Sequence, residues 1–230
     1  MEIDININMN IDMDKNIMRI PPVDISLEDL LSTLRIDSGS DRAEAVDRMR
    51  REAQEIARPV ALYAPLHPEI GDGEIRLNGV RFGEAFVREM LSEGQTVVPY
   101  VATCGSEIEA WAKQFSGPAD CLAANRIMEI CLFKIRDSLH DEVKKRYFDA
   151  SKNISAINPG SLKEWPLSGQ IQLFEALGGA REIGVSLSED LWMSPVKSVS
   201  GILFQTDVAY ENCQLCPRPD CPNRRAEFVG

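Results

Sequence analysis

Residues 183–201 read IGVSLSEDLWMSPVKSVSG, and this stretch says more about the fold than any other part of the chain. It leads into residues 199–204, where valine, isoleucine, leucine and phenylalanine predict a strand. Upstream, the turn signal Asn-Pro-Gly at 158–160 precedes a short helix predicted over about 166–177, and two glycines after that helix are typical of a C-cap. The last third of the chain is therefore predicted to form a turn, a helix and a strand in that order.

The rest of the chain mixes strands and helices in an irregular order. Strands are predicted over 60–66 and 96–103 from their β-branched and aromatic residues. Capping residues and apolar residues at three- and four-residue spacing predict helices over 27–34, 41–57, 82–91 and 106–147, the last with a break near Gly117 and Pro118. Because these elements do not alternate as βαβ units, the pattern predicts an α+β fold.

The two ends of the chain differ from its middle. Residues 3–13 alternate isoleucine or methionine with asparagine or aspartate, which predicts a strand with one buried face. Asparagine and aspartate are poor strand formers, so a low-complexity leader is the alternative. We therefore divide the chain into a leader or edge strand at 1–20, an α+β domain at 21–205 and a cysteine-rich tail at 206–230.

Composition and charge exclude several classes of partner. The 230 residues carry a formal net charge of −11, so neither nucleic acid nor an anionic membrane surface is expected as a partner. No stretch approaches the roughly 20 apolar residues of a membrane helix, and the acidic N-terminus lacks the features of a secretory signal. A cytoplasmic location is predicted, where cysteines are expected as thiols or metal ligands.

The tail is rich in cysteine and proline. Cys213 and Cys216 have the two-residue gap that directs two thiolates at one ion, and Cys221 follows four residues later. A tail with so little apolar surface predicts a metal or iron–sulfur centre; a disulfide, a redox-active thiol loop and a free tail are the alternatives. Three ligands are too few for a closed site, and Cys104, at a predicted strand-to-helix corner, is the candidate for the fourth. The sequence does not separate iron–sulfur from zinc.

Residues 183–201 resemble the activation (reactivation) domain of cobalamin-dependent methionine synthase. That family has a similar Gly-hydrophobic-x-Leu-Thr/Ser-Glu-Ser-x-x-Met-x-Pro-x-x-Ser-Val-Ser-Gly stretch. Residues 158–174 are similar to its Pro-Gly-Tyr segment and the following helix, and residues 101–109 look like the Ala-Thr-x-Gly-x-x-Val-Glu corner of stand-alone relatives. The resemblance covers about residues 20–205 and implies a C-shaped α+β domain on a twisted, mostly antiparallel sheet flanked by helices.

The resemblance also implies a ligand and a partner. The family's domain binds S-adenosylmethionine and docks on the corrinoid-bearing domain when cobalt is oxidised; an electron and the ligand's methyl group then restore methylcobalamin. In this sequence the arginine and tyrosine of the family's Arg-x-x-x-Gly-Tyr motif fall on Ala156 and Ser161. Asn158 and Gly160, through their main chain, and Glu189, facing a sulfonium cation, are the remaining candidate ligand-binding residues.

The resulting hypothesis is an accessory protein for reductive reactivation of a corrinoid-dependent methyltransferase such as methionine synthase. Its iron–sulfur centre would lie in the tail, it would bind S-adenosylmethionine, and it would meet cobalamin only through the partner, a corrinoid-binding protein or the methionine synthase core. The alternative is a non-redox module that binds a corrinoid protein and holds a structural zinc. An independent enzyme is not indicated, because the sequence has no Ser-His-Asp order, no carboxylate pair near a histidine and no Cys-His couple.

Overall fold

A computed structural model describes residues 14–71, 73–208, 210–216, 218, 220, 224 and 226–229. The strand predicted over 3–13 lies outside these residues. The described part of the leader contains a short strand, β1 (Asn16–Arg19), which forms one edge of the main sheet. Because β1 follows the alternating residues, the strand predicted over 3–13 stays a prediction.

In the described part of the chain the main sheet has five strands in the order β1-β2-β6-β10-β7, and every neighbouring pair is antiparallel. Its other strands are β2 (Val60–Tyr63), β6 (Val97–Thr103), β7 (Asn153–Ile157) and β10 (Ser198–Thr206). All seven residues of β6, in the centre, are buried. The sheet therefore carries a core on each of its two faces.

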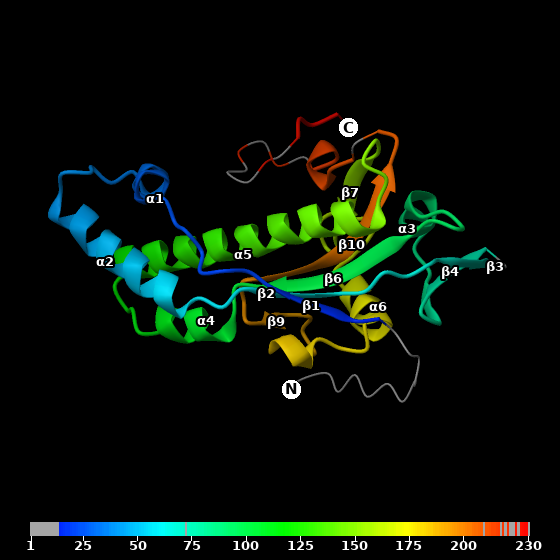
Figure 1. Cartoon of the computed structure of the whole chain (residues 1–230), viewed down its shortest axis with the longest axis horizontal. Helices are drawn as coiled ribbons and strands as arrows, with labels where there is room; N and C mark the ends of the chain where they lie inside the picture. Colours follow the sequence, from blue (N-terminus) through cyan, green and yellow to red (C-terminus); the bar gives the residue numbers. More distant parts are fainter. Residues whose placement is uncertain are drawn as a thin grey trace.

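Four helices pack on one face of the sheet. They are α1 (Leu27–Leu34), α2 (Asp41–Ile56), α4 (Ser106–Ala112) and α5 (Pro118–Tyr147). The long α5 runs along the sheet, and its buried apolar side chains join those of the other three helices in one cluster (Figure 1). The predicted break near residue 117 is confirmed, because a proline at the first helical position starts α5 as a separate helix.

Shorter elements cover the opposite face. They are the three-stranded sheet β3 (Glu69–Gly71), β4 (Glu74–Leu77) and β5 (Val80–Phe82), and the helices α3 (Ala85–Met90) and α6 (Gly169–Ala176). Their apolar residues form a second buried cluster with the sheet. The helix predicted from residue 82 begins only at residue 85, because Phe82 belongs to β5 and pairs there with Ile75 of β4.

Two small pieces complete the second layer. A 3-10 turn, η1 (Arg181–Ile183), precedes the two-residue strands β8 (Ser186–Leu187) and β9 (Met193–Ser194), which pair with each other. The segment after β9 turns into β10. Together these pieces confirm the predicted α+β fold with an antiparallel sheet flanked by helices. None of the described helices is long and apolar enough to cross a membrane.

Candidate ligand cavity

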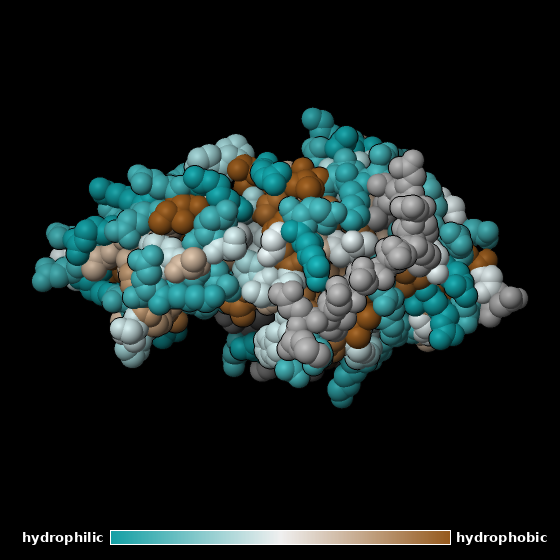
Figure 2. Space-filling view, turned by 90° about the horizontal axis from the view of Figure 1, so that it is seen from below, coloured by the Kyte–Doolittle hydropathy of each residue, from teal (hydrophilic) through white to brown (hydrophobic). Residues whose placement is uncertain are grey.

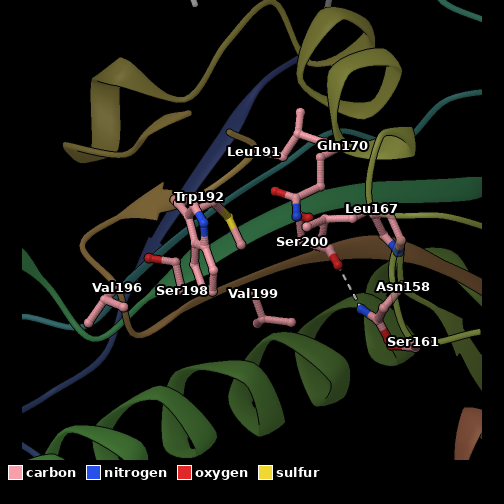
Figure 3. A pocket seen from close by; sticks show the side chains of 12 residues that line it. Asn158, Ser161, Leu167, Gln170, Leu191, Trp192, Val196, Ser198, Val199 and Ser200 are labelled. Atoms are coloured by element: carbon pink, nitrogen blue, oxygen red, sulfur yellow. Dashed lines mark hydrogen bonds between the residues drawn. The ribbon is translucent and has the colours of Figure 1, made fainter. Parts of the chain in front are cut away.

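A cavity of about 320 Å³ lies against the first half of β10, between the start of α6 and the segment that contains β9 (Figure 3). All twelve described residues that line it are uncharged. They are Asn158, Pro159, Ser161, Leu167, Gln170, Leu191, Trp192, Met193, Val196, Ser198, Val199 and Ser200. The cavity thus offers amide and hydroxyl groups, an aromatic ring and a thioether, but no ionised side chain.

The cavity opens where β7 leaves β10. The β7–β10 pairing begins at Ile157 opposite Ile202, so residues 198–201 of β10 have β6 on one side only. The side chain of Asn158, directly after β7, replaces the missing strand, because its Nδ2 donates to the Ser200 carbonyl at 2.7 Å and to the Tyr100 hydroxyl at 3.0 Å. A Cβ on Gly201 would lie 2.3 Å from that Nδ2, so glycine permits the close approach.

The main chain of β10 faces the cavity at alternate residues. The carbonyl of Lys197 accepts from the Cys104 N–H at 3.0 Å. This bond shows which alternate residues of β10 have their main-chain groups directed at β6. Because the bonds of an antiparallel strand alternate between its two sides, Ser198 and Ser200 direct their main-chain groups away from β6. These groups lie on the side that β7 has vacated, and they suit a ligand with its own donors and acceptors.

Gln170 is a buried polar side chain in the wall of the cavity. It is 4% exposed, and its Oε1 has no hydrogen-bond partner among the described residues. In Figure 3 the side chain extends from α6 toward Ser200. Buried polar atoms are nearly always hydrogen-bonded, and an amide oxygen left unpaired at a cavity wall is suited to accept from a ligand.

An aromatic ring stands at the rim. Trp192 is 69% exposed, and the turn before it is closed by the Ser188 hydroxyl, which accepts from the Trp192 N–H at 3.0 Å. Leu191 in this turn has a φ of 64°. An indole face can stack on a flat base or bind a cation, and the neighbouring Met193 is polarisable.

Two carboxylates hold the loop between β9 and β10. Glu109 of α4 accepts from the Val196 N–H at 2.6 Å, and Glu129 of α5 accepts from Lys197 Nζ at 2.8 Å. Burial raises the pKa of Glu129, but hydrogen bonds and charge interactions with Lys197 and Arg126 outweigh it, and the net pKa is lowered. The helices on one face of the sheet therefore position the loop that lines the cavity on the other.

No protein-family model matches the chain, and no curated protein matches it. Among solved structures, the chain is similar to the crystal structure of the MetH reactivation domain bound to AdoHcy. The TM-score is 0.62 and the sequence identity 14%, over 86% of this chain and 80% of that chain. This chain has the fold of the MetH reactivation domain. The fold implied by residues 183–201 is thus confirmed.

Within this MetH reactivation fold, the predicted ligand-binding residues lie at different distances from the cavity. Asn158 lines it. Gly160 lies just outside, with a φ of 80°; a Cβ there would be 2.9 Å from Cδ1 of Leu167, which does line the cavity. Glu189 is exposed in the turn before Trp192 and is not among the lining residues. The cavity is therefore built around the first of the three.

The family's arginine and tyrosine positions have different surroundings. Ala156 is 3% exposed in β7 and packs in the core on the α5 side, so this position does not reach the cavity. Ser161 lines the cavity with a short polar side chain. A ligand carboxylate therefore finds main-chain groups and hydroxyls here instead of a guanidinium.

The structure describes two of the three tail cysteines. Cys213 lies in a 3-10 turn, η2 (Asn212–Gln214), and Cys216 follows it; both are half-buried. Nη1 of Arg224 donates to the Cys213 carbonyl at 2.8 Å, and Nη2 donates to the Cys216 carbonyl at 3.0 Å. Cys221 lies outside the described residues. We call the segment 212–216 the cysteine turn.

Cys104, the predicted fourth metal ligand, lies in the core of the domain. It is fully buried after β6, and burial, together with nearby Cys131 and Glu109, raises the pKa of its thiol to about 12.

The described tail contacts β7 through a bridge between Glu211 and Ala156. Within the described ranges, no group of three or more His, Cys, Asp or Glu side chains is arranged to hold a metal ion.

Sequence reasoning missed two side chains of the cavity. Gln170 and Trp192 both lie in segments that carry the resemblance, yet neither stands out as a site residue from its type or spacing. A buried glutamine without a partner is recognised only when its neighbours in space are known. The exposure of Trp192 likewise is known only from the structure.

Proposed function

We propose that the cavity binds an S-adenosyl compound and that the chain is an accessory protein for reductive reactivation of a corrinoid-dependent methyltransferase such as methionine synthase. One observation carries the proposal. The Gln170 oxygen, which has no partner among the described residues, and the vacated edge of β10 place polar groups in a largely apolar cavity, in a fold whose solved relative holds AdoHcy. In this role the chain would dock on the partner, an electron from a separate reductase would reduce cob(II) to cob(I), and cob(I) would take the methyl group of S-adenosylmethionine and leave S-adenosylhomocysteine.

The cavity chemistry suits such a ligand. A purine can stack on Trp192, and its amino group can donate to Oε1 of Gln170. The zwitterionic amino-acid end can pair with the main chain of Ser198 and Ser200, since none of the described lining residues is charged. A sulfonium is favoured by the aromatic ring and by the chain's net charge of −11.

Exposed hydrophobic side chains near the cavity suit a docking partner. Trp192, Val196 and Leu167 line the cavity and are 69%, 54% and 39% exposed. Val196 also lines a second groove with Leu122, which is 58% exposed. From below, the side of α4, α6 and β9, Figure 2 shows hydrophobic patches toward the middle of this face. We assign this face to the corrinoid protein.

Ligand titration tests the cavity. Isothermal titration of the full chain with S-adenosylhomocysteine is expected to show one site. Gln170→Leu removes the acceptor and is expected to weaken binding about fivefold, since a hydrogen bond contributes about 1 kcal/mol. The same variant is expected to keep or raise the free energy of unfolding, because it removes a buried unpaired oxygen.

Gln172→Leu on the same helix is the matched control, because Gln172 does not line the cavity. Its affinity is expected to equal that of the wild-type chain. A wild-type chain that shows no heat of binding, or equal loss in both variants, would contradict the ligand assignment.

A reactivation assay tests the second half of the proposal. The chain is mixed with the cobalamin-binding part of methionine synthase in the cob(II) state, a one-electron reductant and S-adenosylmethionine. One electron gives cob(I), which takes the methyl group and leaves S-adenosylhomocysteine. We expect methylcobalamin to form faster with the chain than without it, and Trp192→Ala to reduce that gain; an unchanged rate would overturn the role.

We further propose that Cys213, Cys216 and Cys221 hold a metal centre. Arg224 supports this, because its guanidinium binds the carbonyls of both described cysteines and so holds these two residues close together. Cys104 is poorly suited as the fourth ligand, because the raised pKa of its thiol opposes the thiolate form that a metal requires. Another donor, or one from the partner, would close the site.

Protein prepared without oxygen tests the centre. Iron with sulfide and absorbance near about 400 nm, as is typical of iron–sulfur clusters, would support the redox form. Colourless protein with stoichiometric zinc would support the alternative of a non-redox module. Cys213→Ser is expected to abolish the metal in either case while the core stays folded, and metal content equal to that of the wild type would contradict the assignment.

A further inference from the structure

The tail is docked on β7 beside the cavity. Glu211 forms a parallel bridge with Ala156, and the Tyr210 N–H donates to the Ser155 hydroxyl at 3.0 Å. At the start of the tail, the Asn153 side chain donates to the Asp207 carbonyl at 2.9 Å. The tail thus follows the free edge of β7 toward the point where that strand ends.

Asn212 makes a direct link between the cysteine turn and the cavity. It is 8% exposed, and its Nδ2 donates to Oδ1 of Asn158 at 3.3 Å. Asn158 lines the cavity and holds the Ser200 carbonyl through its own Nδ2. The next residue after Asn212 is Cys213. Two hydrogen bonds, through Asn158, therefore connect Asn212 to the edge of β10.

A second contact joins the same two regions. Leu215 of the cysteine turn lines a cavity of about 510 Å³ on the loop 160–167. Ser161 and Leu167 of that loop line both this cavity and the ligand cavity. The loop thus lies between the cysteine turn on one side and the ligand cavity on the other.

We propose that Asn212 is a positioning residue that couples the cysteine turn to the ligand cavity, so that an ordered turn and an occupied cavity stabilise each other. This inference rests on the proposed S-adenosyl ligand. When the cysteine turn is ordered, Asn212 is held in position, and its hydrogen bond holds the side chain of Asn158 at the cavity wall. By thermodynamic linkage, the ligand must in return stabilise the turn by the same factor. A centre held by the cysteines would then set the affinity for the ligand.

A mutant cycle tests the coupling in the full chain, with S-adenosylhomocysteine as the probe. Arg224→Ala releases the carbonyls of the cysteine turn, and we expect it to weaken ligand binding about tenfold, which is within the usual range of coupling between sites. In the Asn212→Ala background, Arg224→Ala is expected to have no further effect on affinity. Asn153→Ala is the matched control, because it removes a bond between tail and β7 that does not reach the cavity.

Amide hydrogen exchange provides a readout that a merely structural role would not change. In the wild-type chain, the ligand is expected to slow exchange in residues 210–216 by about the same tenfold factor, since linkage is reciprocal. In Asn212→Ala, the ligand is expected to leave exchange in this segment unchanged, while Asn153→Ala behaves as the wild type.

The outcomes separate the two proposals. If the wild type binds the ligand but Arg224→Ala weakens binding equally with and without Asn212, the coupling is wrong and the ligand site stands. If ligand binding leaves exchange in the cysteine turn of the wild type unchanged, the coupling is likewise wrong. If the wild type binds no S-adenosylhomocysteine, the proposed ligand falls, and the coupling falls with it.

Discussion

At the scale of single residues, two buried thiols have the most unusual chemistry. Cys104 and Cys131 are both fully buried between the sheet and the helices. Burial raises the pKa of each thiol from 9.0 to about 12. Their neighbours are core side chains, so we assign both a packing role.

These thiols predict a loss of stability in alkaline solution. The folded pKa is raised, so the stabilisation is complete below pH 9, where the unfolded thiols are still protonated. It is lost as pH rises from about 9 to about 12, because only the unfolded chain then releases the protons. Each thiol contributes a slope of up to about 1.4 kcal/mol per pH unit.

Urea denaturation between pH 8 and pH 10.5 measures the slope. The double variant Cys104→Ala/Cys131→Ala is expected to lose stability less steeply than the wild type, although it starts lower because of the cavities left behind. Cys121→Ala, at an exposed cysteine, should keep the wild-type slope. Equal slopes in all three proteins would show that the buried thiols do not titrate in this way.

At the scale of elements, the positions of α4 and α5 determine the shape of the cavity. Helix α4 supplies Glu109, which is 13% exposed at its side chain and accepts from the Val196 N–H. Helix α5 supplies Glu129 to Lys197. Both bonds cross from the helical face to the loop that starts β10. The loop therefore depends on contacts far from it in sequence.

Glu109→Ala is expected to lower the free energy of unfolding by about 1.5–3 kcal/mol, because a hydrogen bond to a charged acceptor is lost. The same change frees the loop, so affinity for S-adenosylhomocysteine is expected to fall as well. Urea denaturation and calorimetric titration measure the two effects. Glu107→Ala, at an exposed residue two positions away, is the control and should change stability by less than about 0.5 kcal/mol. An affinity unchanged in Glu109→Ala would show that the bond does not position the loop.

At the scale of the whole molecule, one sheet carries two cores. Leu139 belongs to the cluster under α5, and Phe174 belongs to the cluster under α6. Strand β6 contributes alternate side chains to both clusters: Tyr100 packs in the first and Val101 in the second. Since the strands are shared, we expect the two cores to unfold together.

Leu139→Ala and Phe174→Ala are each expected to shift a single unfolding transition, by about 2–5 kcal/mol. Trp111 reports on the first core and Trp165 on the second, so single-tryptophan variants followed by fluorescence should give coincident curves. Leu122→Ala, at a residue 58% exposed, should leave the transition in place. Two separate transitions would show that the cores unfold independently.

The local elements and the fold class could be predicted from the amino-acid sequence. The cap at Ser26, the start of α5 at Pro118 and the strand in residues 199–204 depend on neighbours along the chain, and the structure contains all three. The resemblance in residues 183–201 could be recognised because these residues form one continuous segment, which contains β8, β9 and the start of β10.

Which of these residues form the cavity depends on how the elements pack together. Gln170 and Ser200 meet because β7 leaves β10 after Ile157, and no local signal marks where two paired strands part. Cys104 has a suitable residue type and a suitable corner, but the packing of α5 over β6 encloses it in the core. Burial and long-range pairing arise from contacts between distant segments, so the sequence predicted the elements and one lining residue, Asn158, but not the rest of the cavity.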